Sequence, residues 1–121
     1  MRSSLLFAAL PIALLSAGSA QALEMCVVAG NSAIMGANMS AAFDTAGQGC
    51  MSDIRPQGSL SSSEISQRAQ HGTVTMVDKD TWTYVPTSGY VGSDSFAITA
   101  TGKSIDEKPG TSVLNFKVNV K

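Results

Sequence analysis

The sequence predicts an all-β fold, a sandwich or barrel of antiparallel strands, over residues 58–121. Short runs rich in Val, Ile, Thr and aromatic residues recur between turn residues in this part of the chain, which is the pattern of short antiparallel strands. The last run, residues 112–121, alternates between apolar and mainly polar positions, as expected for a strand with one buried and one solvated face. Its apolar positions are Leu114, Phe116, Val118 and Val120.

Four further strands are expected between residue 58 and this last run. Pro86 ends the third of them, because proline has no N–H to donate to a neighbouring strand. In the fourth, Phe96, Ile98 and Ala100 share one face. The expected strands are 62–68, 73–77, 81–85 and 94–101, and the loops after the second, third and fourth strands are 78–80, 87–93 and 102–110.

Residues 1–22 have the three parts of a secretory signal peptide. Arg2 supplies a positive charge, residues 5–15 form an apolar run, and A-Q-A at 20–22 is a cleavage site. The apolar run is shorter than the roughly 20 residues that span a bilayer, so we interpret it as a cleaved signal rather than an anchor. The prediction is a mature chain that starts at Leu23, is periplasmic or secreted, and has no membrane insertion after cleavage.

The chain has two cysteines, Cys26 and Cys50, and both lie after the predicted cleavage site. In an exported protein, one intramolecular disulfide is the expected state of such a pair, whereas a redox-active pair has two residues between its cysteines. Residues 23–57 are otherwise rich in glycine and small residues. We expect loops and short strands there, tied by the disulfide to the sandwich at 58–121, with 23–121 folding as one unit.

Charge argues against a nucleic-acid partner. The chain has eight Lys and Arg against nine Asp and Glu, a net charge of −1, and these charges are spread thinly. No basic patch is visible in the sequence, and nucleic-acid binding depends on one.

Three sequence strings resemble one family of domains. HGTVT at 71–75, WTYVP at 82–86 and GYVGSDSF at 89–96 are similar to the G-T-V … Y-x-P … G-Y-x-G-x-D-x-F pattern of bacterial Ig-like, cadherin-like repeats of exported and cell-surface proteins. The resemblance covers about residues 58–121 and implies an Ig-like antiparallel β-sandwich that acts as a binding module. The chain differs from the tandem arrays of that family in holding one copy and in adding the N-terminal segment with its cysteine pair. The motif residues are Gly72, Tyr84, Pro86, Tyr90, Gly92, Asp94 and Phe96.

These motif residues have structural interpretations. Gly72 and Gly92 suit turns that require positive φ, and the motif's aromatic residues supply large apolar area. Asp94 is short enough to accept hydrogen bonds from loop amides. The alternative for Asp94 is a calcium ligand together with Asp78 and Asp80, although these acids follow no calcium-loop spacing.

The sequence contains one histidine, His71, and no arrangement typical of catalysis. A catalytic histidine needs a nucleophile and an orienting acid beside it. The sequence has no G-x-S-x-G elbow and no glycine-rich phosphate loop before a helix. We therefore predict a non-enzymatic protein with no cofactor and no metal site.

The methionines allow an alternative to the prediction that the protein has no metal site. Thioether sulfur is a good ligand for Cu(I), although methionine is also used to fill irregular gaps in a core. A periplasmic copper-binding protein is therefore a second hypothesis. The residues concerned are Met25, Met35, Met39 and Met51, with Met76 and His71 later in the chain.

The leading hypothesis is an exported, non-enzymatic Ig-like module that binds a protein or a glycan in the bacterial envelope or outside the cell. Its expected contacts are the sheet edges and the loops at 87–93 and 103–109, because loops carry recognition in sandwich folds. A third hypothesis is a small secreted enzyme inhibitor that presents a disulfide-braced loop near Cys50.

Overall fold

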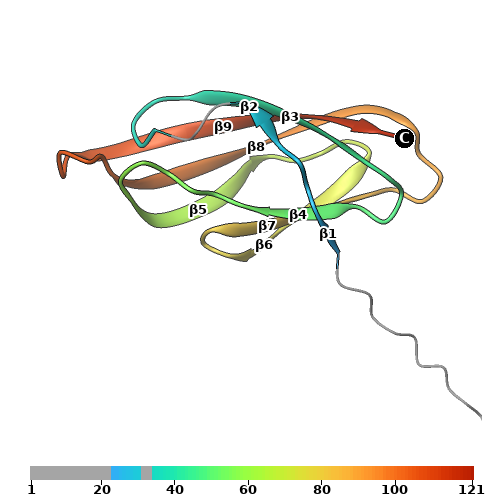
Figure 1. Ribbon diagram of the computed structural model, residues 1–121, viewed down its shortest axis with the longest axis horizontal. Helices are drawn as coiled ribbons and strands as arrows, with labels where there is room; N and C mark the ends of the chain where they lie inside the picture. The colour runs from blue at the N-terminus through green and yellow to red at the C-terminus, as the bar shows by residue number, and fades with distance from the viewer. Residues whose placement is uncertain (1–22, 31–33) are drawn as a thin grey trace, which may run out of the picture.

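The computed structural model describes residues 23–30 and 34–121. These residues form an elongated sandwich of two β-sheets, and the long strands β8 (Gly92–Lys103) and β9 (Pro109–Val120) run along much of its length (Figure 1). The predicted all-β sandwich is confirmed. The other strands are β1 (Glu24–Met25), β2 (Ala29–Gly30), β3 (Met39–Thr45), β4 (Cys50–Asp53), β5 (Ser59–Gln67), β6 (Gly72–Asp78) and β7 (Thr81–Pro86).

The first sheet has the strand order β1-β4-β7-β6, and the second has the order β2-β3-β9-β8-β5. At one edge, the chain leaves the first sheet after β1 and crosses to the second sheet at β2 (Figure 1). At the other edge, β5 and β6 are the last strands of their sheets and lie beside each other. Two strand pairs, β1 with β4 and β3 with β9, are parallel, whereas the other pairs are antiparallel.

Alternate side chains of the long strands fill the space between the sheets. The apolar positions that alternation assigned to one face of β8 and β9 are all buried, which confirms that prediction. Trp82 and Tyr84 of β7 point inward from the first sheet and are fully buried. Phe43 of β3 lies among these aromatic rings, with its centroid 5.4 Å from that of Trp82 and 6.2 Å from that of Phe96.

Residues 23–57 supply strands to both sheets. β3 lies inside the second sheet and pairs with β9 along its whole length, from Met39 opposite Leu114 to Thr45 opposite Val120. The predicted disulfide is confirmed, because Cys26 and Cys50 are bonded with their Cα atoms 5.0 Å apart. It joins the crossing after β1 to the first residue of β4, so this segment is held by strand pairing as well as by a covalent bond.

One expected loop is shorter than the sequence suggested. Strands β8 and β9 extend to Lys103 and Pro109, which are paired in the ladder. Only residues 104–108 remain between them. Glycines at 102 and 110 read as loop residues in the sequence, but they face each other in the ladder, and the absence of a side chain lets the backbone of Ser59 approach Gly102 closely.

The expected signal peptide, residues 1–22, lies outside the described residues. Within the part of the chain that the structure describes, no helix has the length and apolarity needed to cross a membrane.

Candidate functional site

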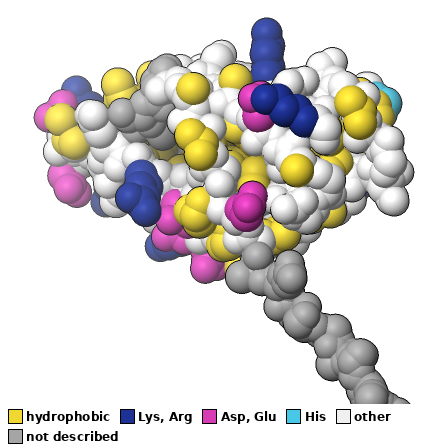
Figure 2. Space-filling view, turned by 45° about the vertical axis from the view of Figure 1, so that its right-hand side comes forward, with side chains coloured by type: hydrophobic (Ala, Val, Ile, Leu, Met, Phe, Trp, Pro, Cys, Tyr) yellow, Lys and Arg dark blue, Asp and Glu magenta, His cyan; other side chains and the backbone are white. Residues whose placement is uncertain are grey.

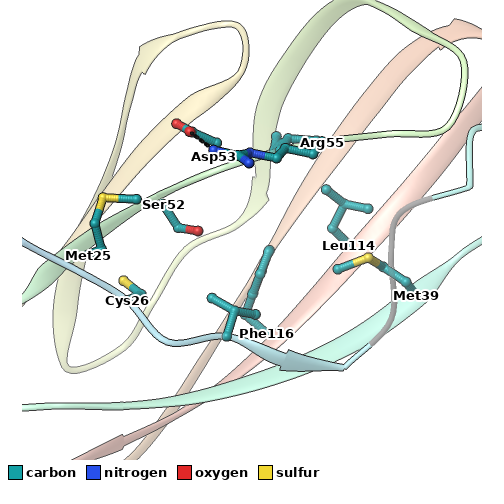
Figure 3. Close-up of a pocket in the computed structure, with 10 residues that line it drawn as sticks. Met25, Cys26, Met39, Ser52, Asp53, Arg55, Leu114 and Phe116 are labelled. Atoms are coloured by element: carbon teal, nitrogen blue, oxygen red, sulfur yellow. Dashed lines mark hydrogen bonds and ion pairs between the residues drawn. The ribbon is translucent and has the colours of Figure 1, made fainter.

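A pocket with both apolar and polar lining opens at the edge of the sandwich where the chain crosses from β1 to β2. Its volume is about 290 Å³. Met25 and Met39 lie on opposite sides of it (Figure 3), and Val28 of the crossing segment also lines it. Leu114 and Phe116 of β9 are its most buried lining residues, with 1% and 4% of their surface exposed. The pocket therefore reaches from the surface to the core between the two sheets.

Polar groups lie at one side of this pocket. Arg55 and Asp53 form an ion pair (Figure 3), in which the nitrogen and oxygen lie 3.3 Å apart. Their side chains are 83% and 34% exposed. Asp53 is also held by Thr81, whose hydroxyl donates a hydrogen bond of 3.1 Å to it. An exposed ion pair contributes little to stability, so the Arg55 side chain is available to a second partner at small cost.

The dimensions of this pocket restrict what it can bind. Small-molecule sites have volumes of about 300–1,000 Å³, and the volume of this pocket lies just below that range.

The surface of the molecule carries mixed side chains. Figure 2 shows charged side chains of both signs scattered over the face in view, with hydrophobic side chains between them. A pocket that combines buried apolar residues with charged residues at one side has the character of a protein-interface pocket that receives one side chain.

A second arrangement involves Asp94, at the start of β8. Its carboxylate accepts four hydrogen bonds. The donors are the Tyr84 hydroxyl at 2.8 Å and the backbone N–H groups of Gln70 at 3.0 Å, His71 at 3.0 Å and Ser95 at 2.8 Å. Asp94 of β8 therefore connects the turn between β5 and β6 with strand β7.

These contacts determine the ionisation of both side chains. Burial disfavours the charged form of Asp94, but the bonds from Tyr84 and the three N–H groups outweigh it and lower the pKa of Asp94. Burial, followed by the hydrogen bond to Asp94 and its negative charge, raises the pKa of Tyr84. At neutral pH, an ionised carboxylate therefore accepts a bond from a neutral phenol, a charge-assisted pair.

The remaining motif residues pack around this bond. Gly72 lies in strand β6 without the positive φ that the sequence suggested, so that expectation was wrong. Its backbone lies against the ring of Tyr84 instead, and a Cβ at Gly72 would lie 2.8 Å from ring atoms. Pro86 is opposite Gly72 in the ladder. Phe96 stacks on Tyr84 with a centroid distance of 5.8 Å. The structure thus brings these motif residues together as a packing unit.

Tyr90 and Gly92 form the adjoining corner. Gly92 has a φ of 139°, and the Tyr90 hydroxyl donates to the carbonyl of Ser93 at 2.6 Å. The ring of His71 stacks on that of Tyr90, with centroids 4.1 Å apart. One face of each ring is therefore covered by the other.

The structure separates the acidic residues considered as calcium ligands. Asp78 and Asp80 lie at the hairpin between β6 and β7, whereas Asp94 lies near Gly72, at the other end of β6. Both oxygens of Asp94 already accept two hydrogen bonds each, which uses the acceptor capacity of a carboxylate. Over residues 23–30 and 34–121, no three His, Cys, Asp or Glu side chains are grouped as metal ligands.

The methionines are distributed over different environments. Met35 belongs to the core, is 3% exposed and lies 3.9 Å from the Ser112 hydroxyl. Met25 adjoins Met51 in the pairing of β1 with β4 and shares the edge pocket with Met39. Met76 lies on β6, the last strand at the other edge of the first sheet.

The two loops expected to make contacts lie at opposite ends of β8. Val91 and Ile105 are their exposed apolar residues, at 70% and 73% exposure. Because β8 spans Gly92–Lys103, the two loops do not form one continuous surface.

Comparison with known families identifies the domain family of this chain. Residues 26–119 match the model of the bacterial Ig domain family. The chain belongs to this family. The resemblance found in the motif strings is thereby confirmed, and the match also includes most of the N-terminal segment, well before residue 58. A comparison with curated proteins found no match.

Membership of a fold family does not by itself define a function, which depends on the site that the individual domain carries. Sequence reasoning did not identify the edge pocket. Its lining comes from four strands and from the connections that follow β1 and β4. No local motif signals such a site, because only folding brings its residues together.

Proposed function

We propose that this chain is an exported, non-catalytic Ig-like module that binds a protein partner in the bacterial envelope or outside the cell. In this proposal, the partner places an apolar side chain in the edge pocket and a polar group against Arg55 or Asp53. The observation that carries the proposal is the edge pocket, about 290 Å³ in volume, which has the buried apolar residues Leu114 and Phe116 in its lining and an ion pair at its side.

Family and covalent structure support the exported, non-catalytic part of the proposal. The match of residues 26–119 to the bacterial Ig domain family supports a non-enzymatic module. The Cys26–Cys50 disulfide is compatible with an oxidising compartment outside the cytoplasm. The signal-peptide pattern of residues 1–22 supports the same location.

The chemistry of the surface favours a protein over a glycan. Glycan sites present open aromatic faces beside polar groups, whereas the His71 ring covers one face of Tyr90. The edge pocket instead offers methionine and aliphatic walls, with Met25 and Met39 able to adapt to the shape of an inserted side chain.

Site-specific crosslinking tests this proposal. A photo-reactive phenylalanine replaces Met25, which is 56% exposed at the pocket, in protein expressed in its host. The control position is Ile105, which is 73% exposed in the loop between β8 and β9. We expect one discrete crosslinked partner from position 25 and none from position 105.

A pocket-filling variant gives the second test. Met39→Trp places a larger side chain in the pocket and is expected to abolish the crosslink from position 25, while Ile105→Ser leaves it unchanged. If no partner is captured in the envelope or the medium, or if Met39→Trp leaves capture unaffected, the proposal is wrong.

Export is tested separately by the intact mass of the protein purified from the periplasm or medium. The expected mass is that of a chain that begins at Leu23 and lacks the two hydrogens lost on disulfide formation. A mass that includes residues 1–22 would refute cleavage.

A further inference from the structure

Strand β6 is the last strand of the first sheet and has a neighbour, β7, on one side only. Gly72 of β6 is opposite Pro86 of β7. Continuing this register by one residue places His71 opposite Thr87. The N–H of Thr87 donates to the carbonyl of His71 at 2.8 Å. Residues 71 and 87 are therefore a hydrogen-bonded pair of the ladder.

This bond fixes the direction of the backbone groups along β6. Hydrogen-bonded and non-hydrogen-bonded pairs alternate along an antiparallel ladder. Thr73 and Thr75 are thus bonded to β7, whereas the N–H and C=O groups of Gly72, Val74 and Met76 point away from it. These groups form a row of donors and acceptors that faces the open edge.

The exposed row lacks the features that usually protect a sheet edge. Natural edges are guarded by charged side chains, proline or bulges, and residues 72–76 of β6 contain none of these. The irregularity of β6 comes only between Met76 and Asp78. The neighbouring edge strand β5, by contrast, has two register shifts and carries Glu64. Of the two, β6 is the less protected edge.

Charges of opposite sign lie at the two ends of this row. Arg68 lines a hollow of about 480 Å³ together with Gly72 and Val74, so it lies at the start of β6. Asp78 is exposed at the other end, in a hairpin where Asp80 balances the charge of Lys79 and the net charge is therefore negative. An antiparallel copy of β6 would reverse this order and bring each positive end beside a negative one.

We propose that β6 of one molecule pairs with β6 of a second copy of this chain, antiparallel and about a two-fold axis. Residues 72–76 of the two copies form the new ladder. Arg68 of each copy lies beside Asp78 of the other, so the ion pair occurs twice. The first sheets of the two molecules become one continuous sheet.

This pairing leaves the edge pocket free. The pocket lies at the β1 edge, whereas β6 is the opposite edge of the first sheet. A dimer therefore presents two pockets that face outward at its far ends. When a partner occurs in several copies on a surface, two linked sites bind that surface more tightly than a single site does.

Analytical ultracentrifugation of residues 23–121 tests the pairing, over concentrations from about 1 μM to 1 mM, which covers the usual range of weak dimers. We expect a reversible dimer. Val74→Pro removes an N–H of the open edge and places a ring there, yet it leaves the bonds to β7 intact; we expect a monomer. Val74→Thr keeps that N–H and a similar shape, and we expect it to dimerise like the parent.

Charge reversal tests the same arrangement without proline. Arg68→Glu and Asp78→Arg should each weaken dimerisation by about fivefold to twentyfold, because each removes two ion pairs and adds repulsion. The double variant Arg68→Glu with Asp78→Arg restores both pairs and should regain most of the affinity. Circular dichroism and Trp82 fluorescence check that every variant is folded.

Three results would overturn the proposal. One is a parent chain that stays monomeric over the whole concentration range. Another is a dimer that folded Val74→Pro retains. The third, which applies even if Val74→Pro fails to fold, is a double charge variant that dimerises no better than the two single ones.

Discussion

The hydroxyl of Tyr84 donates a hydrogen bond of 2.8 Å to the carboxylate of Asp94, and both groups are buried. The three N–H groups that share this carboxylate come from the turn before β6 and from β8. One carboxylate thus connects the two sheets at this end of the sandwich. The Y-x-P and D-x-F parts of the motif are therefore two halves of one structural contact.

Asp94→Asn is expected to destabilise the fold by about 3 kcal/mol, because hydrogen bonds to a charged acceptor are strong and an amide cannot accept all four. Tyr84→Phe should cost about 1–2 kcal/mol, since Asp94 keeps its three N–H donors. Urea unfolding of both variants and the double variant measures their coupling, for which we expect about 1 kcal/mol. Additive effects would contradict the direct bond.

Stability should depend on pH through Asp94. The pKa of Asp94 is lower in the folded protein than the ordinary aspartate value of 3.8, so the unfolded chain binds the proton more readily. The contribution of Asp94 is therefore fully present above about pH 5 and is lost as the pH falls through the lowered pKa of the folded state. Urea unfolding between pH 2 and 7 should show a steeper acid loss for the parent than for Asp94→Asn. Parallel curves would refute this assignment.

Gly72→Ala is expected to destabilise the protein by about 1–3 kcal/mol, the usual cost of overpacking a core. The new methyl group would lie 2.8 Å from atoms of the Tyr84 ring, and stacking on Phe96 limits how far this ring can shift. Gly47→Ala is the matched control, because a Cβ there has nothing within 4 Å. Thermal unfolding of both variants should separate them clearly, and equal melting temperatures would contradict the packing described.

The strands after residue 58 were predictable because their alternation has a simple physical cause. Large apolar residues such as Phe96 and Leu114 recur at every second position and face one core. Strand β3 was harder to predict from the sequence. Ala41 and Phe43 are buried, but exposed Ala42 lies between them, so the apolar pattern does not alternate. Its parallel pairing with β9 is also a long-range contact that no local signal encodes.

The edge pocket was unpredictable for a related reason. Asp53 and Arg55 follow one another closely in the sequence, yet Met39 and Leu114 reach the same pocket from other strands. The sequence left the methionines as candidate copper ligands or as residues that fill gaps in the core, and Met35 is a core residue. Their placement in the core and around an opening depends on the crossing of the chain between sheets, which tertiary structure alone defines.

The disulfide offers a last prediction, because it lies where the chain has least strand pairing. Strand β1 has only two residues, and Cys26 joins this edge to Cys50 of β4. Replacing both cysteines by alanine should lower the free energy of unfolding by about 3 kcal/mol, as the chain-entropy model gives for a loop of this size. Hydrogen exchange should rise more at residues 24–28 than in β8 and β9, since the crossing segment loses its anchor. A loss under about 1 kcal/mol with unchanged exchange at the crossing would show that strand pairing alone holds this edge, and Cys26 would then be dispensable to the pocket that it lines.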